Sequence, residues 1–238
     1  TPYNAAWLLA RSGASSLTGL VRCGMRALDR YNGLAADEVW EEPPEARYLA
    51  ALLQTLACLC RTPFADQPSL HVQQEELVAY VVACGLIHRS TELFSLFDQP
   101  AANDTAPVPG YVLQCLALLE AITGGPRRRS PAVGLTIQKR WLPQAANGAA
   151  IALAFQETSM AGLPSLLTAV LLRAAPSCTP AEARPERLPP NFVEAAACVM
   201  RVLNNIARLD LVAAQCSLGA SELRVVFFHL VGFLLSYC

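Results

Sequence analysis

A short basic stretch holds the densest group of side chains that could do chemistry in this chain. Its charged residues are Arg127, Arg128, Arg129, Lys139 and Arg140, and Trp141 follows directly. Contact with the phosphates of RNA needs only a local density of positive charge, and a neighbouring tryptophan can stack on a base. The stretch therefore predicts an RNA contact, with a solvated basic loop as the alternative interpretation.

The same stretch contains a pattern that protein kinases use. In RRRSP, three arginines precede Ser130 and a proline follows it, although short matches of this kind are frequent by chance. Phosphorylation of Ser130 would offset much of the positive charge of the basic stretch. We therefore expect either an RNA contact or a loop that phosphorylation regulates.

Cysteine and histidine occur without a pattern for metal binding. The nine cysteines lie mostly inside apolar helical stretches, and no two of them form a Cys-x-x-Cys pair. His71, His88 and His229 stand at no ligand-like spacing from one another or from a cysteine pair. We predict reduced thiols that fill the core, and no metal site.

Catalytic sequence motifs give no support to an enzyme. The chain has no glycine-rich dinucleotide or phosphate loop, and the sequence GAS at 219–221 has no strand before it to form a nucleophile elbow. We expect a protein without catalytic activity, cofactor or small-molecule substrate. A hydrolase on a helical scaffold is the alternative, and it requires a cavity that gathers a serine, a histidine and an acid.

Composition limits the partners of the chain. Its 238 residues are 53% apolar, enough for a sizeable core, and 18 basic residues against 19 acidic ones leave a net charge of -1. No global field therefore attracts nucleic acid or an anionic membrane. The longest apolar stretch, residues 225–237, contains His229 and is shorter than the roughly 20 residues of a membrane span. Since no secretory leader opens the sequence, we expect a cytoplasmic chain without membrane contact.

The elements that must position these residues are helices, because strand signals are nearly absent. Apolar residues recur at helical spacing, as at Leu17, Leu20, Val21, Met25 and Leu28. Helices are predicted over residues 15–28, 45–60, 74–84, 90–97, 111–122, 163–174, 191–209 and 221–238.

Three glycine corners indicate an internal repeat. Gly85, Gly162 and Gly219 each join two apolar helices, and a long third helix belongs to each unit. This plan resembles the armadillo repeat, whose units stack because one unit alone cannot bury its apolar faces. We predict one all-α domain over residues 1–238, a right-handed armadillo-like or HEAT-like α-solenoid of about three to four irregular repeats. An irregular all-α bundle is the alternative.

The spacing of the corners departs from a regular repeat. They are 77 and 57 residues apart, whereas armadillo units have about 40 to 47 residues. The surplus falls in sequence rich in proline, glycine, alanine and charge. We therefore predict mobile insertions near residues 98–110, 124–148 and 173–190.

The predicted third helices, residues 48–60, 111–123 and 192–207, carry polar residues at matching positions. Their alignment places Thr55, Glu120 and Asn205 in register, and Arg208 follows Asn205. The armadillo resemblance implies that an asparagine at this position lines a concave groove and hydrogen-bonds an extended peptide. We predict partner binding at these four residues, with an exposed polar row that binds nothing as the alternative.

A more particular resemblance begins at residue 62. The sequence TPFADQPSLHVQQEELVAYVVACGLI, residues 62–87, resembles the C-terminal region of the family of S-phase cyclin A-associated proteins of the endoplasmic reticulum. The resemblance is strongest at residues 63–64 and 72–80, and it covers roughly residues 46–238. The zinc finger, coiled coil and membrane-associated parts of the family are not in this chain, which implies a fragment of a longer protein.

The family resemblance implies an adaptor. Proteins of this family are linked to tubulin autoregulation: they join a ribosome-bound tetratricopeptide-repeat factor, which recognises nascent tubulin, to the cytoplasmic deadenylase complex, so that tubulin mRNA decays. The implied partners are that factor, the ribosome and its RNA, and the deadenylase complex. The implied location is the cytoplasm, or the surface of the endoplasmic reticulum through parts outside this chain.

Two further functions stay open. The family name implies a cell-cycle scaffold that binds cyclin A, and RAL at 26–28 and RYL at 47–49 match the Arg-x-Leu kernel by which cyclins recognise partners. Both motifs lie inside predicted apolar helices, so we expect Leu28 and Leu49 in the core. A generic armadillo-type peptide-binding module is the other function.

Overall fold

The computed structural model describes residues 2–32, 38–40, 42–62, 64, 67–98, 107–124, 145–158, 166 and 191–209. The prediction of an all-α protein is confirmed for these ranges, which contain no strand. The α-helices are α1 (Pro2–Tyr31), α2 (Pro44–Arg61), α3 (Pro68–Ala83), α4 (Leu86–Ser95), α5 (Gly110–Gly124), α6 (Ala145–Glu157) and α8 (Phe192–Leu209). Two short 3₁₀ helices, η1 (Glu38–Trp40) and η2 (Leu96–Asp98), complete the described elements.

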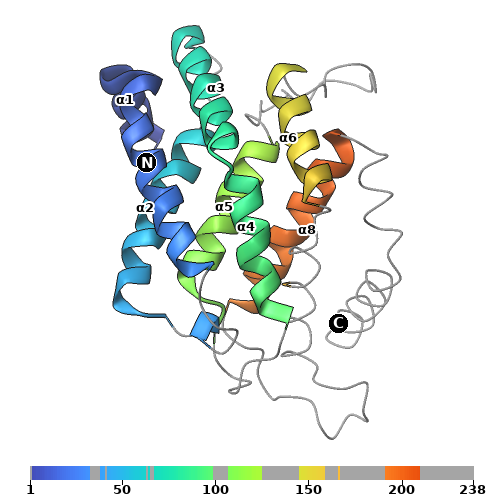
Figure 1. Ribbon diagram of the computed structural model, residues 1–238. Coiled ribbons are helices and arrows are strands. Elements are labelled where there is room, and N and C mark those ends of the chain that lie inside the picture. The colour runs from blue at the N-terminus through green and yellow to red at the C-terminus, as the bar shows by residue number, and fades with distance from the viewer. Residues whose placement is uncertain are drawn as a thin grey trace, which may run out of the picture.

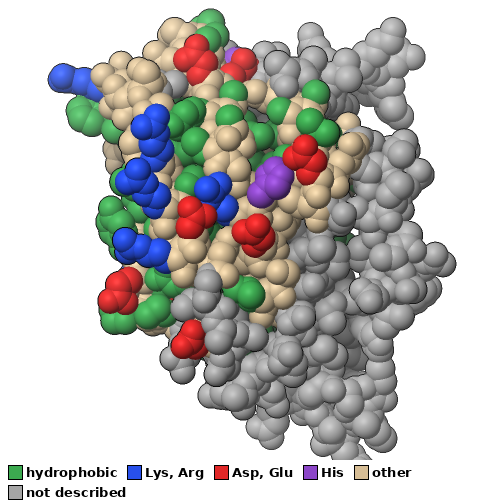
Figure 2. Space-filling model, viewed as in Figure 1, with side chains coloured by type: hydrophobic (Ala, Val, Ile, Leu, Met, Phe, Trp, Pro, Cys, Tyr) green, Lys and Arg blue, Asp and Glu red, His purple; other side chains and the backbone are tan. Residues whose placement is uncertain are grey.

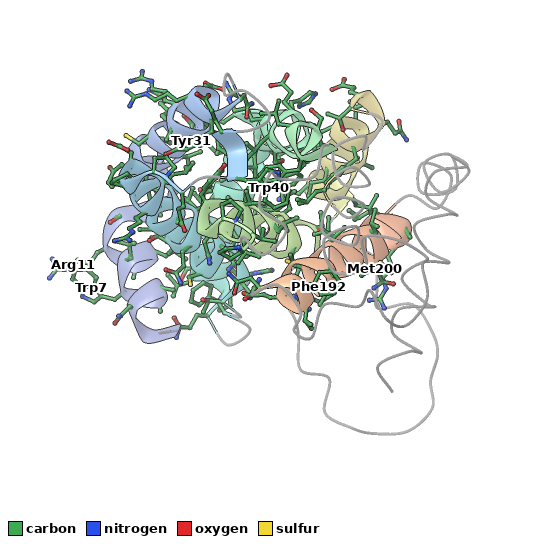
Figure 3. All side chains as sticks on the ribbon, turned by 90° about the horizontal axis from the view of Figure 1, so that it is seen from below. Trp7, Arg11, Tyr31, Trp40, Phe192 and Met200 are labelled. Carbon is green, nitrogen blue, oxygen red and sulfur yellow. The ribbon has the colours of Figure 1, made fainter. Side chains whose placement is uncertain are left out.

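The helices form two layers (Figure 1). In one layer α2, α5 and α8 lie side by side, with α5 in the middle. In the other layer α1 packs against α3 and α4, and α6 packs against the same two helices. Figure 3 shows the two layers from below. One hydrophobic core, to which every α-helix contributes, lies between them.

Helices α2, α5 and α8 run in the same direction. Arg201 and Asn205 of α8 contact Glu120 and Thr123 of α5 in the same order along both helices. At the other side of α5, Arg61 at the end of α2 reaches Ala117 and Glu120, near the end of α5. The first turn of α5 lies near Glu42, which precedes α2. Helix α5, which lies between α2 and α8 in its layer, is buried on nearly every side.

The predicted corner at Gly85 is confirmed. Gly85 has φ 77° and ψ 31°, a left-handed conformation, and it separates α3 from α4. The Arg89 guanidinium lies against it, donating hydrogen bonds to the Cys84 carbonyl at 2.5 Å and to the Asp29 carboxylate of α1 at 2.5 Å. The corner thus fixes α4 onto α1. The corners predicted at Gly162 and Gly219 lie outside the described residues.

A side chain of α3 satisfies the end of α2. The Gln74 amide is buried and donates hydrogen bonds to the carbonyls of Leu59 at 2.6 Å and Thr62 at 2.8 Å. The last carbonyls of a helix have no partner within the helix, and a buried carbonyl without one costs free energy. Gln74 therefore supplies hydrogen-bond donors to carbonyls that have no partner within α2.

The starts of several helices need correction, including α3, which begins at Pro68 rather than at Gln74. Helix α6 begins at Ala145, within the insertion predicted near 124–148, because Ile151, Ala154 and Phe155 bury one helical face while the sequence Asn147-Gly148 suggests a turn. Helix α1 begins 13 residues before the predicted start at Ser15 and is kinked at Gly13, whose φ is 64° and ψ 164°. The rest of the predicted insertion at 124–148, after Gly124, and the whole insertion at 173–190 lie outside the described residues, as do residues 99–106.

None of the described helices is by itself long and apolar enough to span a membrane, but α3 and α4, bent by 51° at their junction, have the necessary length and composition as a pair.

Candidate protein interface

An ion-pair row crosses the surface of the α2, α5 and α8 layer. Glu120 of α5 lies between two arginines: its Oε1 accepts from Nε of Arg201 at 2.9 Å, and its Oε2 lies 3.4 Å from Nη2 of Arg61. The Cys198 thiol of α8 lies 3.5 Å from the same Oε2. We call Arg61, Glu120 and Arg201 the ion-pair row. It joins all three helices of the layer.

The three side chains of the ion-pair row differ in how far they are buried. The Glu120 side chain is only 8% exposed, whereas the arginine side chains are 52% and 45% exposed. A buried carboxylate requires partners, and two guanidinium groups supply them. Each guanidinium has five N–H donors, so donors remain at the surface after the bonds to Glu120 are made. The row as a whole carries one excess positive charge.

Asn205 is held one helical turn beyond the ion-pair row. Its Nδ2 donates to the Thr123 hydroxyl at 3.1 Å, and that hydroxyl donates to the Leu119 carbonyl at 2.7 Å. Gly124 provides the space, because a Cβ at that position would lie 3.2 Å from the Asn205 amide. Asn205 therefore belongs to the same face as Glu120.

The predicted register of Thr55, Glu120 and Asn205 needs correction. Glu120 is level with Arg201 and Asn205 with Thr123, so Glu120 and Asn205 are offset by about one turn. Thr55 is exposed on α2 and its hydroxyl donates to the Ala51 carbonyl of its own helix at 2.8 Å. Alignment of helices by sequence fixes their order but not the axial shift that side-chain packing produces.

The other predicted site residues separate into two groups. Arg208 is exposed in the last turn of α8, where a positive charge interacts favourably with the helix dipole. The predicted RNA contact or phosphorylated loop lies outside the described residues, namely Arg127, Arg128, Arg129, Ser130, Lys139 and Arg140. Sequence reasoning missed Arg61 and Arg201, although each is a charged residue on the polar side of an amphipathic helix.

The thiols of the described residues are all free, but only some fill the core. Cys60, Cys115 and Cys198 are buried, and burial raises the pKa of each thiol to about 12. Cys23 and Cys58 are exposed, which corrects the prediction of core thiols at these positions. Among the described residues, no group of three or more histidine, cysteine, aspartate or glutamate side chains could hold a metal ion.

Thiol labelling tests which of these thiols are buried and which are exposed. Cys23 and Cys58 are expected to react with iodoacetamide in the folded protein at pH 8, whereas the three buried thiols react only after unfolding in urea. Burial raises the pKa of these thiols to about 12, so very little of the thiolate, the form that reacts, is present at pH 8. Peptide mass spectrometry assigns each adduct. Rapid native labelling of Cys115 would contradict the packing of α5.

The cyclin-type motifs lie as predicted, with their leucines in the core. Leu28 and Leu49 are almost completely buried, in α1 and α2 respectively. A docking motif must present its leucine to the partner, so neither motif is available in the folded chain.

No family model matches this chain, and no curated protein or solved structure is significantly similar to it.

The ion-pair row is also expected to contribute to the stability of the protein. Glu120→Gln is expected to lower the free energy of unfolding by about 1–2 kcal/mol, because an amide cannot accept two charged hydrogen bonds as a carboxylate does. The loss is moderate since both arginines can turn to solvent. Urea denaturation measures it. Glu76→Gln, at an exposed position in the interior of α3, is the matched control and is expected to change little. Equal stabilities for the two variants would contradict a structural role for Glu120.

Proposed function

We propose that this chain is a non-enzymatic adaptor, an armadillo-like α-solenoid that binds a segment of a partner protein on the face formed by α2, α5 and α8. The observation that carries the proposal is the ion-pair row, which places two half-exposed arginines on one face of three parallel helices. The same face carries Asn205 one turn further on.

The order of the helices supports a solenoid. Predicted third helices of successive repeats correspond to α2, α5 and α8, and these three lie side by side in chain order (Figure 1). In a solenoid each repeat packs on its neighbours alone, and the equivalent helices form one continuous surface. Helices α3 and α4, which meet at the Gly85 corner, would be the first two helices of the repeat that α5 completes.

The chemistry of the face favours an extended peptide. Guanidinium groups donate hydrogen bonds in a planar fork that matches carboxylates and can also reach peptide carbonyls. Glu120 anchors both arginines from below, which reduces the side-chain freedom that binding must remove. A partner segment with carbonyl and carboxylate oxygens in sequence would meet donors from α2 and α8 together.

The family resemblance names the partner in this proposal. The adaptor would join the tetratricopeptide-repeat factor that recognises nascent tubulin on the ribosome to the cytoplasmic deadenylase complex, and tubulin mRNA would decay as a result. Its location would be the cytoplasm or the surface of the endoplasmic reticulum. This part of the proposal rests on the sequence resemblance, which is strongest at residues 63–64 and 72–80.

Binding measurements test the two parts separately. Biolayer interferometry with the immobilised chain is expected to show binding of the purified tetratricopeptide-repeat factor or of a deadenylase subunit. The double variant Arg61→Ala, Arg201→Ala is expected to weaken it at least ten-fold. The matched control is Arg11→Ala, an exposed arginine of α1 that lies over the Trp7 ring, at the opposite end of the protein from Phe192 and Met200 of α8 (Figure 3).

The possible outcomes distinguish an error in the proposed partner from an error in the proposed binding face. If neither partner binds at micromolar concentration, the tubulin-decay function is refuted. If a partner binds the double variant as tightly as the unchanged protein, the adaptor function stands but the proposed face is wrong. Thermal unfolding of each variant shows whether it remains folded.

A further inference from the structure

A second charged feature lies on the opposite layer of the protein. Arg22, Arg26 and Arg30 are exposed on α1 at intervals of four residues, which places their side chains on one side of the helix. Figure 2 shows a column of arginine side chains at the α1 side of the molecule. We call these three residues the arginine stripe. It does not include any residue of the α2, α5 and α8 face.

Acidic groups near the arginine stripe do not neutralise it. Asp29, the acidic residue of α1 next to the stripe, accepts from Arg89 of α4. Nε of Arg22 donates to the hydroxyl of Tyr80, an uncharged partner, at 2.8 Å. Arg26 and Arg30 make no hydrogen bond or ion pair with any residue that the structure describes. The stripe therefore presents three positive charges to solvent.

Like charges at four-residue spacing destabilise a helix, so the arginine stripe is unfavourable for α1 alone. An anionic partner would remove that repulsion on binding. A helix advances about 6 Å in four residues, so a second helix with carboxylates at the same spacing presents one carboxylate to each arginine. We propose that the arginine stripe binds an acidic helix of a partner protein.

The dimensions of the stripe favour an acidic helix over RNA. The stripe is one helix wide and about 12 Å long, which suits three carboxylates but few phosphates of a nucleic-acid strand.

Fluorescence polarisation tests the proposal. The probe is a labelled, alanine-based helical peptide of about 20 residues with three glutamates at four-residue spacing, and the matched peptide has glutamines instead. At about 0.15 M salt the glutamate peptide is expected to bind, and the glutamine peptide to bind at least ten-fold more weakly. The chain variant Arg26→Glu, Arg30→Glu is expected to weaken binding of the glutamate peptide at least ten-fold.

Controls keep the result interpretable. Arg47→Glu, an exposed charge reversal on α2, is expected to leave peptide binding unchanged. The double variant is expected to keep a cooperative thermal transition, because it gains one opposite-charge pair, between residues 22 and 26, and keeps one like-charge pair, between residues 26 and 30.

Three results would overturn the proposal. They are no binding of the glutamate peptide to the unchanged chain, full binding to the double variant, and tighter binding of an oligouridine RNA that the double variant loses. None of these results bears on the proposed adaptor face, which the Arg61 and Arg201 variants test independently.

Discussion

Leu116→Ala is expected to lower the free energy of unfolding by about 2–5 kcal/mol. Leu116 is completely buried in α5, the helix that packs between α2 and α8. Removing most of its side chain loses the free energy of burial and leaves a cavity that helices on both sides cannot both close. Urea denaturation followed by circular dichroism measures the loss.

The chain offers a matched leucine as the control. Leu153 of α6 is 55% exposed, so Leu153→Ala removes the same atoms from a site that is largely in water. We expect its effect to stay within about 0.5 kcal/mol. If the two variants lost similar stability, α5 would not be the buried centre of its layer.

Gly85→Ala is the second substitution with a large expected effect, a loss of about 2–4 kcal/mol. An alanine in the left-handed conformation costs about 1–2 kcal/mol. The added Cβ would lie 2.6 Å from Nη1 of Arg89, so the guanidinium must move away from the Cys84 carbonyl. Loss of a charged hydrogen bond adds about 1.5–3 kcal/mol, and solvent replaces part of it because Arg89 is partly exposed.

Substitution of a glycine in α1 is expected to have the opposite effect on the free energy of unfolding. At Gly19 a Cβ would meet no atom within 4 Å, and the residue lies in helical backbone. Gly19→Ala is therefore expected to stabilise the protein by about 0.5–1 kcal/mol, since alanine favours a helix interior more than glycine does. Chemical denaturation of the two variants side by side decides the question. A destabilising Gly19→Ala, or a neutral Gly85→Ala, would contradict the backbone described at that position.

The sequence pattern predicted the helices more completely than the residues of the candidate site. Helices depend on neighbouring residues, whereas the site depends on residues far apart in the chain. The stripes of α2, α5 and α8 and the corner at Gly85 depend on neighbours within a few residues, so spacing and backbone preference reveal them. The start of α6 was hidden because Asn147 and Gly148 favour a turn in isolation, and packing of Ile151 and Phe155 overrides that preference.

The ion-pair row depends on residues far apart in the chain. Glu120 meets Arg61 and Arg201 only because three helices lie side by side with a particular axial shift. Sequence alone could place a glutamate within an apolar helix, where burial requires a partner, but it could not say which arginine supplies it. The predicted residues Asn205 and Glu120 thus lie on one side of the α2, α5 and α8 layer, and the arginines that contact Glu120 were not predicted.

The Gln74 amide has a consequence for how the protein opens. Its bonds to the Leu59 and Thr62 carbonyls mean that the last turn of α2 is complete only when α3 has docked. Local opening of α3 exposes those carbonyls, and fraying of α2 removes both acceptors from a buried amide. The end of α2 and the part of α3 around Gln74 therefore behave as one cooperative unit, whose amide protons exchange with solvent together.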